Sequence, residues 1–597
     1  MVRNLFCKSV KNFVRLKFEN KVVLITGSGT GIGMTVAKKF VESGASVIIL
    51  GRRKEPLEST SEMLTKIINE KNSNGFVKIF SGVDVSDENA ITEMFDTLKN
   101  EGVNVDIVVN NAGVSGPVTC FAHAPLEDFR STVDIHLTGT FWTSVQALKV
   151  MKEGAKIITI STFFAEERPL EQRPYRFRGP YTASQGAKNR LVEAMSWELT
   201  EKGIVSIGTN PGPVHSDRIY KTVYPKAASE FLRVSGFEEL IPTEVEIVNK
   251  EILGLLGEDE ETIKNGIKAA AEKLGKQEST LTNLLNKVQS IAEKIQKNTS
   301  TMIPDQQFLS QDQVATTILT LADDDQAKIL NGKIIPGDRV FYPVRSHITS
   351  IPETVKQHDY SSKIAVLTID ATNEEDAKRA EEIAANIESN GGQAICFISD
   401  KCSKEVQDSI TNKFHSHVID FSKNEEITRW FNTAKSKGDI EVFIHITGKV
   451  PNISRLTELS RKEWDGLTNK FINIPATVSQ NAMNIFVPNG SDDPRLFKDA
   501  TGRIVIIGPD LPYGKKIGGG ERAKVEVFRG ALRPFATTVN QELSDVLKSN
   551  VRVFLVLAGA VDGKEPNNAR ITDAINYSIS NDSKSSAEVI FCPDESR

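Results

Sequence analysis

The sequence predicts two tandem α/β units, each built on a doubly wound parallel sheet. In both halves of the chain, short apolar runs alternate with stretches of helical periodicity, the pattern of parallel strands joined by helices. The first apolar run, Val22–Thr26, leads into a glycine-rich turn that opens a helix. The second half repeats this order from Lys363 onward without the glycines. At 597 residues the chain is too long for one such unit, which favours an internal duplication.

The turn after the first run carries the strongest chemical signal. Its sequence, GSGTGIG from Gly27 to Gly33, lets the backbone approach a pyrophosphate at the N-terminus of the following helix. Helical periodicity from Met34 to Glu42 and a stop at Gly44 supply the expected context. We therefore predict a dinucleotide site whose turn residues are Thr26, Gly27, Ser28, Gly31, Ile32 and Gly33.

The end of the second run predicts which dinucleotide binds. Val47–Leu50 is followed by Gly51, Arg52 and Arg53, where a protein that binds NAD usually has a carboxylate for the ribose 2′-hydroxyl. Two guanidinium groups suit a 2′-phosphate instead, so NADP(H) is favoured over NAD(H). The alternative interpretation is a solvated loop in which both arginines face water.

Four further landmarks follow in order. Asp84–Val85 follow a third run, Asn110–Gly113 close a fourth, Ile157–Thr162 form a fifth and Pro211–Val214 close a sixth. With the glycine turn, they resemble the short-chain dehydrogenase/reductase family from the amino terminus to about Arg345. The resemblance implies a Rossmann-like fold and hydride transfer with a nicotinamide cofactor. It also implies cofactor contacts from Asp84, Val85, Asn111, Ala112, Gly113, Pro211, Gly212 and Val214.

The same resemblance implies a catalytic set. Tyr181, at the start of a predicted helix, matches the family's general acid, which protonates the carbonyl oxygen as hydride reaches the carbon. Thr162 stands at the family's serine and keeps a hydroxyl donor. Two positions depart from the family. Gln185 replaces the lysine four residues after the tyrosine, and His136 replaces an asparagine that holds a water near that lysine. The charge that assists the tyrosine is therefore missing from its usual place.

Three features of the sequence are candidates to replace that charge. Lys188 shares the helical face of Tyr181 but lies about 10.5 Å along the axis, so we expect its side chain not to close the gap. His136 either relays protons beside Gln185 near neutral pH or is a buried histidine bonded to the backbone. The segment 166–179 either supplies cations or is a solvated loop; its arginines are Arg168, Arg173, Arg176 and Arg178.

We interpret the second half as a degenerate copy of the first. Ala371–Asp376 replaces the glycine turn, and acidic side chains there would repel a pyrophosphate. An alignment of the two copies sets Glu542 opposite Glu198 at the ends of matching helices. It places Val525 opposite the tyrosine and Arg529 opposite the glutamine, so this copy lacks the acid. The alternative is an unrelated α/β domain.

The tandem arrangement also resembles one half of the bifunctional malonyl-CoA reductases of bacteria. That resemblance implies NADPH and a carboxylated acyl-CoA or semialdehyde substrate. We expect a basic leader over 1–20, an NADP-binding unit over 21–350 with a helical insert at about 222–305, and the degenerate unit over 360–597. The insert is either packing or a lid over a large substrate.

Two arginines are candidates to bind the substrate. Arg218 lies at the base of the insert, and Arg178 precedes Tyr181. Guanidinium groups pair well with a carboxylate or a phosphate, so both suit a charged substrate.

Composition limits the classes of partner. A net charge of −5, with no basic face beyond the leader, argues against nucleic acid, and no apolar stretch reaches the length of a membrane span. Five cysteines without paired spacing are typical of reduced thiols and predict a cytoplasmic location, and no ligand cluster predicts a metal. The second copy is expected to form an internal pseudo-dimer with the first, and homodimerisation stays open.

The sequence therefore predicts an NADPH-dependent reductase acting on a small-molecule carbonyl or acyl-CoA thioester, with malonyl-CoA and malonic semialdehyde as candidate substrates. The alternative is a catalytically impaired NADP-binding sensor or scaffold of the same fold, which Gln185, His136 and the degenerate copy favour. Both alternatives predict that the cofactor binds, so only turnover separates them.

Overall fold

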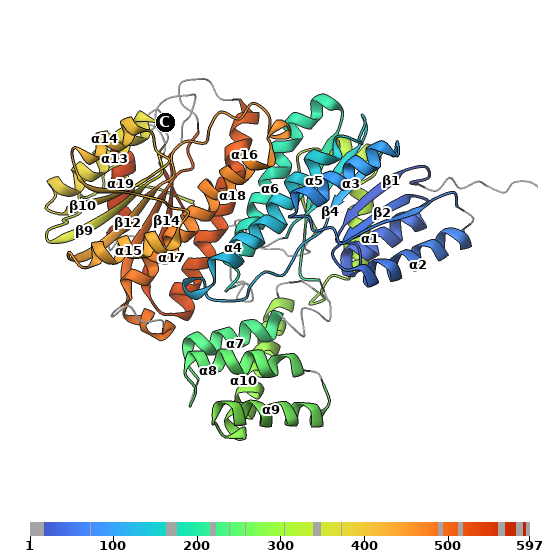
Figure 1. Ribbon diagram of the computed structural model, residues 1–597, viewed down its shortest axis with the longest axis horizontal. Helices are drawn as coiled ribbons and strands as arrows, with labels where there is room; N and C mark the ends of the chain where they lie inside the picture. Colours follow the sequence, from blue (N-terminus) through green and yellow to red (C-terminus); the bar gives the residue numbers. More distant parts are fainter. Residues whose placement is uncertain are drawn as a thin grey trace, which may run out of the picture.

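The computed structural model describes residues 17–71, 73–162, 176–214, 223–237, 239–256, 258–301, 303, 305–337, 348–371, 373–487, 493–511, 518–558, 567–580 and 589–592. Within these ranges the chain forms two parallel sheets, of seven and eight strands, each covered by helices on both faces (Figure 1). The predicted class of two tandem Rossmann-like, doubly wound units, the first with a helical insert, is confirmed. Of the expected leader, residues 1–16 lie outside the described residues.

The first sheet has the strand order β3-β2-β1-β4-β5-β6-β7, and all of its neighbouring strands are parallel. Its strands are β1 (Val22–Thr26), β2 (Ser46–Gly51), β3 (Val77–Ser81), β4 (Ile107–Asn110), β5 (Lys156–Ile160), β6 (Val205–Pro211) and β7 (Ile334–Gly337). Its helices are α1 (Gly31–Glu42), α2 (Lys54–Glu70), α3 (Glu88–Asn100), α4 (Leu126–Val133), α5 (Gly139–Ala147), α6 (Gly179–Leu199), α11 (Gln311–Leu321) and α12 (Asp324–Ile329). The order reverses between β1 and β4, and ligands of such sheets bind where the order reverses.

The second sheet repeats this plan in the order β11-β10-β9-β12-β13-β14-β15-β8. Its strands are β8 (Ile348–Ser350), β9 (Lys363–Ile369), β10 (Gln393–Ser399), β11 (His415–Ile419), β12 (Asp439–Ile446), β13 (Thr501–Ile507), β14 (Asn550–Ala558) and β15 (Val589–Cys592). Its helices are α13 (Glu374–Ser389), α14 (Lys404–Thr411), α15 (Asn424–Lys435), α16 (Arg461–Thr468), α17 (Ile474–Phe486), α18 (Gly519–Gln541) and α19 (Asn568–Ile579). Because β8 pairs with β15, the second unit takes in a strand that we had assigned to the first; three residues carry no readable periodicity.

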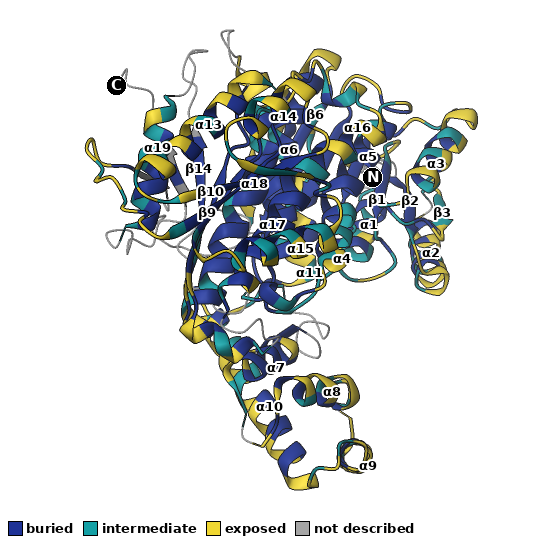
Figure 2. Ribbon diagram, turned by 60° about the vertical axis from the view of Figure 1, so that its left-hand side comes forward, coloured by how far each residue is buried: buried dark blue, intermediate teal, exposed yellow. Residues whose placement is uncertain are grey.

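The two units share one hydrophobic core. It joins one face of each sheet through α3, α5 and α6 on one side and α16, α17 and α18 on the other. Helices α6 and α18 lie side by side in the middle of the molecule, where both are buried (Figure 2). They touch backbone to backbone at Gly186 and Gly530, because a Cβ on Gly186 would lie far inside contact distance of the Gly530 carbonyl oxygen. The outer faces of the sheets have separate cores.

A helical insert leaves the first unit between β6 and α11 and projects from the body of the molecule (Figure 1). It comprises α7 (Tyr224–Ser235), α8 (Pro242–Ile252), α9 (Glu260–Leu274) and α10 (Glu278–Ser300). The insert has its own apolar core, built from the stripe that the sequence shows at helical spacing, including Leu281, Leu284 and Val288.

Candidate active site and cofactor cleft

A cavity of about 930 Å³ opens at the carboxyl ends of β1, β4, β5 and β6, where the strand order reverses. Most of the site residues predicted from the sequence line it. From the cofactor set these are Gly27, Gly31, Ile32, Arg52, Arg53, Asp84, Val85, Asn111, Ala112, Gly113, Pro211, Gly212 and Val214. From the catalytic and substrate sets they are His136, Thr162, Arg178, Tyr181 and Gln185. Arg218 lies outside the described residues.

The glycine turn has the shape that a pyrophosphate needs. Gly27 and Gly31 have φ angles of +65° and +62°, which side chains other than glycine rarely adopt. In the described part of the chain, no atom lies within 4 Å of the position that a Cβ on Gly31 would take. The turn therefore keeps open space at the N-terminus of α1, where backbone N–H groups attract a phosphate.

Three further residues predicted to bind the cofactor make contacts that support the turn from behind. The Thr26 hydroxyl accepts hydrogen bonds from the N–H groups of Asn111 (3.0 Å) and Ala112 (2.8 Å). The Ser28 hydroxyl donates to Ile25 O (2.9 Å) and accepts from Leu50 N (3.0 Å), which ties the turn to β2. A Cβ on Gly33 would lie 2.5 Å from Asn111 Nδ2, so this position holds α1 close to β4.

The two arginines after β2 differ in their partners. Arg52 lies 3.4 Å from the Asp84 carboxylate across the mouth of the cavity, and its side chain is 60% exposed. The other Asp84 oxygen accepts from Ser86 N (3.0 Å) and Ser86 Oγ (2.7 Å). Arg53 stands at the start of α2 and lines the same mouth. Two guanidinium groups thus flank this end of the cleft, beside a single carboxylate.

Gln185 takes part in a buried network of neutral groups. Its Nε2 lies 3.2 Å from His136 Nδ1, and its Oε1 accepts from the Ser161 hydroxyl at 3.2 Å. His136 Nε2 lies 2.8 Å from Val114 O, which assigns the ring proton to Nε2 and leaves Nδ1 to accept from the amide. The glutamine is therefore fixed on both ends of its amide.

His136 does not supply the missing charge. Burial and, to a smaller extent, the nearby charge of Lys188 lower its pKa to about 3, while the bond to Val114 acts in the opposite direction. The ring is thus neutral at pH 7. Of the two interpretations that the sequence left open, the structure favours the buried histidine bonded to the backbone.

Lys188 reaches the cavity, which the axial spacing alone had led us not to expect. It lines the cleft together with Tyr181 and Gln185, and its positive charge contributes to the lowered pKa of His136. Helical side chains lean toward the N-terminus and a lysine stem spans more than one turn of helix, which accounts for a residue two turns after Tyr181 lining the same cavity. Burial lowers the pKa of Lys188 to about 7. The spacing of seven residues, two helical turns, was the signal that could have identified it.

Arg178 and Tyr181 lie against each other at the start of α6. The Arg178 guanidinium carbon stands 3.9 Å from the centre of the tyrosine ring, and this guanidinium also donates to Ser115 O. The ring of His136 contacts the tyrosine edge-on from another side, with centroids 5.3 Å apart. The Tyr181 ring therefore packs against both the Arg178 guanidinium and the His136 imidazole, and both of these residues line the cleft.

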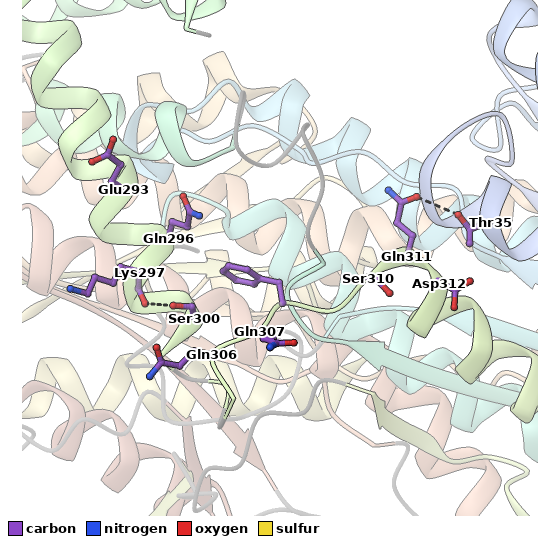
Figure 3. A pocket seen from close by; sticks show the side chains of 11 residues that line it. Thr35, Glu293, Gln296, Lys297, Ser300, Gln306, Gln307, Ser310, Gln311 and Asp312 are labelled. Carbon is purple, nitrogen blue, oxygen red and sulfur yellow. Dashed lines mark hydrogen bonds between the residues drawn. The ribbon is translucent and has the colours of Figure 1, made fainter.

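A second cavity, of about 1050 Å³, adjoins the first beneath the insert (Figure 3). Gln311, at the start of α11, lines both cavities, and its Oε1 accepts from the Thr35 hydroxyl at 3.3 Å. The other walls come from the end of α10 and the segment that follows, and amide and hydroxyl side chains dominate them: Gln296, Ser300, Gln306, Gln307 and Ser310.

The matching place in the second unit is filled by its own side chains. Asp376, on α13, is fully buried and its Oδ2 accepts from Lys449 N at 3.2 Å. Arg379 and Asp510 form a buried ion pair beside it. Arg529, opposite Gln185 in the alignment, donates to Pro509 O at 2.7 Å, and Val525 is buried at the position of the tyrosine. No group of three or more potential metal ligands gathers within the described ranges.

Comparison with known proteins supports the family assignment. The profile of the short chain dehydrogenase family matches residues 21–224. The 3alpha-hydroxysteroid dehydrogenase of Mediterraneibacter gnavus is 32% identical over 209 residues, which are 35% of this chain and 78% of that protein. The 7alpha-hydroxysteroid dehydrogenase of Escherichia coli K12 is 27% identical over 231 residues, 38% of this chain and 85% of that protein.

Two crystal structures share the tandem fold over almost the whole chain. The N-domain of a bacterial malonyl-CoA reductase, solved with NADP, has a TM-score of 0.70 at 15% identity and covers 97% of this chain and 98% of its own. The C-domain, also with NADP, has a TM-score of 0.74 at 17% identity, with coverage of 97% and 99%. No helix in the described residues is long and apolar enough to cross a membrane. On its sequence relatives and its fold, the chain belongs to the short-chain dehydrogenase/reductase family of oxidoreductases.

Proposed function

We propose that the first unit is an NADPH-dependent reductase of a small-molecule carbonyl or acyl-CoA thioester. The observation that carries the proposal is the convergence of a tyrosine, a threonine hydroxyl and a buried lysine on one cavity, beside an open glycine turn. These groups would supply a proton donor, a hydrogen-bond donor and a cation to the same cavity. Malonyl-CoA and malonic semialdehyde are the first substrates to test, because the tandem fold is that of malonyl-CoA reductase domains.

The cleft fits NADP(H). The glycine turn from Gly27 to Gly31 would hold the pyrophosphate, and Arg52 and Arg53 would face the 2′-phosphate. Residues Asn111–Gly113 and Pro211–Val214 would line the remaining length of the cofactor. The bound cofactor supplies the hydride, and all other groups of the reaction come from this chain.

Tyr181 acts as the general acid in this proposal. Its hydroxyl donates a proton to the oxygen of the reduced carbonyl, while the Thr162 hydroxyl donates a hydrogen bond to the same oxygen. Lys188 provides the positive charge that favours proton loss from the phenol, which Gln185 does not provide. Gln185 and His136 hold the backbone around the tyrosine through their neutral network.

The substrate side of the cleft favours a charged and extended molecule. Arg178 lines the cavity next to the tyrosine and suits a carboxylate, and Arg218 would add a second cation at the base of the insert. The amide-rich cavity beneath the insert adjoins this site and offers partners to a long arm with amide groups. In this proposal the insert would act as a lid beside the site.

The test is NADPH oxidation by the whole chain with malonyl-CoA and with malonic semialdehyde. Replacement Tyr181→Phe should lower kcat by about 10²- to 10⁴-fold, the usual range for a general acid, and leave the Kd for NADPH within about twofold. Turnover that survives this replacement would remove Tyr181 as the acid. Tight NADPH binding by the wild type without turnover of any carbonyl would favour the alternative, a binding protein without catalysis.

A further inference from the structure

A carboxylate of the second unit is buried against the first unit near the proposed site. Glu542 opens the short π-helix η12 (Glu542–Val546) at the end of α18, and its side chain is 1% exposed. Its Oε2 accepts from Phe121 N at 2.7 Å and its Oε1 accepts from Phe177 N at 2.8 Å. Burial raises its pKa to about 8, and the two N–H donors act in the opposite direction. Removing a carboxyl group from water costs free energy, and these two hydrogen bonds offset part of that cost.

Phe177 is a strained residue that Glu542 holds in place. Its φ angle is +68°, in the left-handed region that residues other than glycine rarely adopt. Its N–H donates to the carboxylate, and its carbonyl oxygen accepts from Thr119 N at 3.0 Å. Such a conformation persists only where the surroundings fix it on both sides.

The segment that follows Phe177 leads directly to the proposed acid. The next residue, Arg178, stacks on the Tyr181 ring, and its carbonyl oxygen accepts from Thr182 N in the first turn of α6. The residue before Phe177, Arg176, pairs with Asp545, also on η12 of the second unit. The segment that leads to Tyr181 is therefore bonded to the second unit at two neighbouring residues, Arg176 and Phe177.

We propose that Glu542 is a positioning residue of the reductase site, which fixes Phe177 and, through Arg178, sets the orientation of Tyr181. The inference rests on the proposed function, because it assigns the tyrosine as the acid. The second unit then serves the first by fixing the segment that leads to Tyr181.

The chain contains a matched control for this inference. Glu198, the residue aligned with Glu542, makes the reciprocal contact, since its carboxylate accepts from Leu456 N at 2.7 Å and Thr457 N at 3.0 Å in the second unit. Both glutamates bridge the units with two backbone bonds. Only Glu542 is attached to the segment before the tyrosine.

The experiment compares Glu542→Gln with Glu198→Gln in the full chain. Each replacement puts an NH₂ donor where an oxygen accepts from a backbone N–H, so both should lower the melting temperature by similar amounts. Glu542→Gln should also lower kcat by about tenfold to a hundredfold, with the Kd for NADPH within about twofold, because a small displacement of a catalytic group has effects of this size. It should raise amide hydrogen exchange over residues 176–182. Glu198→Gln should change neither kcat nor that exchange.

Two outcomes would overturn the inference: equal kcat values for the two variants, or unchanged exchange over residues 176–182 in Glu542→Gln. If Glu542→Gln does not fold, Asp545→Asn replaces it, since Asp545 is 46% exposed and its carboxylate pairs with Arg176 and accepts locally from Ser544. That variant should lower kcat in the same direction by about two- to fivefold, and an unchanged kcat counts against the proposal. A wild type without turnover refutes the proposed function, whereas the exchange measurement still reports on the anchoring.

Discussion

The two units share a strand order but make opposite use of the turn after their first strand. In the first unit, Gly27 and Gly31 keep the start of α1 bare, and a cavity of about 930 Å³ opens in front of it. In the second unit, Asn373 caps α13 with its own side chain, accepting from Asp376 N at 3.0 Å, and three acidic residues occupy the first turn. One helix start is left for a ligand and the other is satisfied internally.

The buried charged side chains at the corresponding place in the second unit lie close to one another. A Cβ on Gly448 would lie 2.7 Å from Asp376 Oδ2, so the carboxylate packs closely against the loop after β12. The first unit has Ala112 and Gly113 in the corresponding loop. Burial, with the nearby Asp510 charge, raises the pKa of Asp376 to about 6, while Arg379 opposes this shift. The two units therefore share a scaffold and differ in the backbone that they leave exposed after the first strand.

The largest effect is expected from breaking the ion pair that fills the second cleft. Arg379→Met removes the cation from a fully buried Asp510 and should lower the free energy of unfolding by about 3–5 kcal/mol. The matched variant Arg52→Met breaks the exposed pair with Asp84 and should cost less than about 1 kcal/mol. Urea denaturation measures both. Similar losses would mean that the Arg379–Asp510 pair is not the support of the second cleft.

The next effect concerns the cation of the first cleft. Because burial lowers the pKa of Lys188 to about 7, its ammonium is present below that pH and is lost as the pH rises through it. We expect kcat/KM to fall with rising pH through about 7, and Lys188→Met to lower its maximum by about a hundredfold and remove this limb. Lys202→Met, at an exposed position after the same helix, is the control and should keep the wild-type profile. A pH profile that Lys188→Met leaves intact would exclude Lys188 as the cation.

A smaller effect is expected from restoring the usual family residue. Gln185→Lys restores the family's charge, but it also removes the contacts that Gln185 makes in this structure. The new ammonium would be buried close to Lys188 and would break the network with Ser161 and His136. We expect a rate about tenfold lower and a loss of about 1–3 kcal/mol in stability. Adding Gln185→Lys to Lys188→Met should recover part of the rate. A faster single variant would show that the network is dispensable.

The smallest effect should be on cofactor choice. Arg53→Ala removes one of the two cations at the mouth of the first cleft, while Arg52 keeps its contact with Asp84. We expect the preference for NADPH over NADH, measured as the ratio of kcat/KM, to fall by about tenfold, the worth of one exposed phosphate contact. The exposed Lys54→Ala, one residue later, should leave the ratio unchanged. An equal change in both variants would point to a general charge effect.

Local patterns were sufficient to predict the fold class and most of the lining of the cleft. Apolar runs and helical periodicity placed the strands, and the residues after them line the cavity because the carboxyl ends of parallel strands meet at one edge. The same patterns do not separate the roles of neighbouring residues. Thr26, Ser28 and Gly33 belong to the turn motif, yet their contacts lie behind it. A motif records which residues make a turn and does not separate those that face the ligand from those that hold the backbone.

The sequence by itself determined the order of strands, the open turn in the first unit, its loss in the second and the position of Tyr181, since each depends on residues close together in the chain. Only the tertiary structure decided that Lys188 reaches the cleft, that His136 is neutral and that Glu542 lies beside Phe177. The first depends on the direction and length of a helical side chain, and the second follows from burial, which disfavours the charged imidazole. The third joins residues 365 positions apart, a contact that only the packing of α18 on α6 creates.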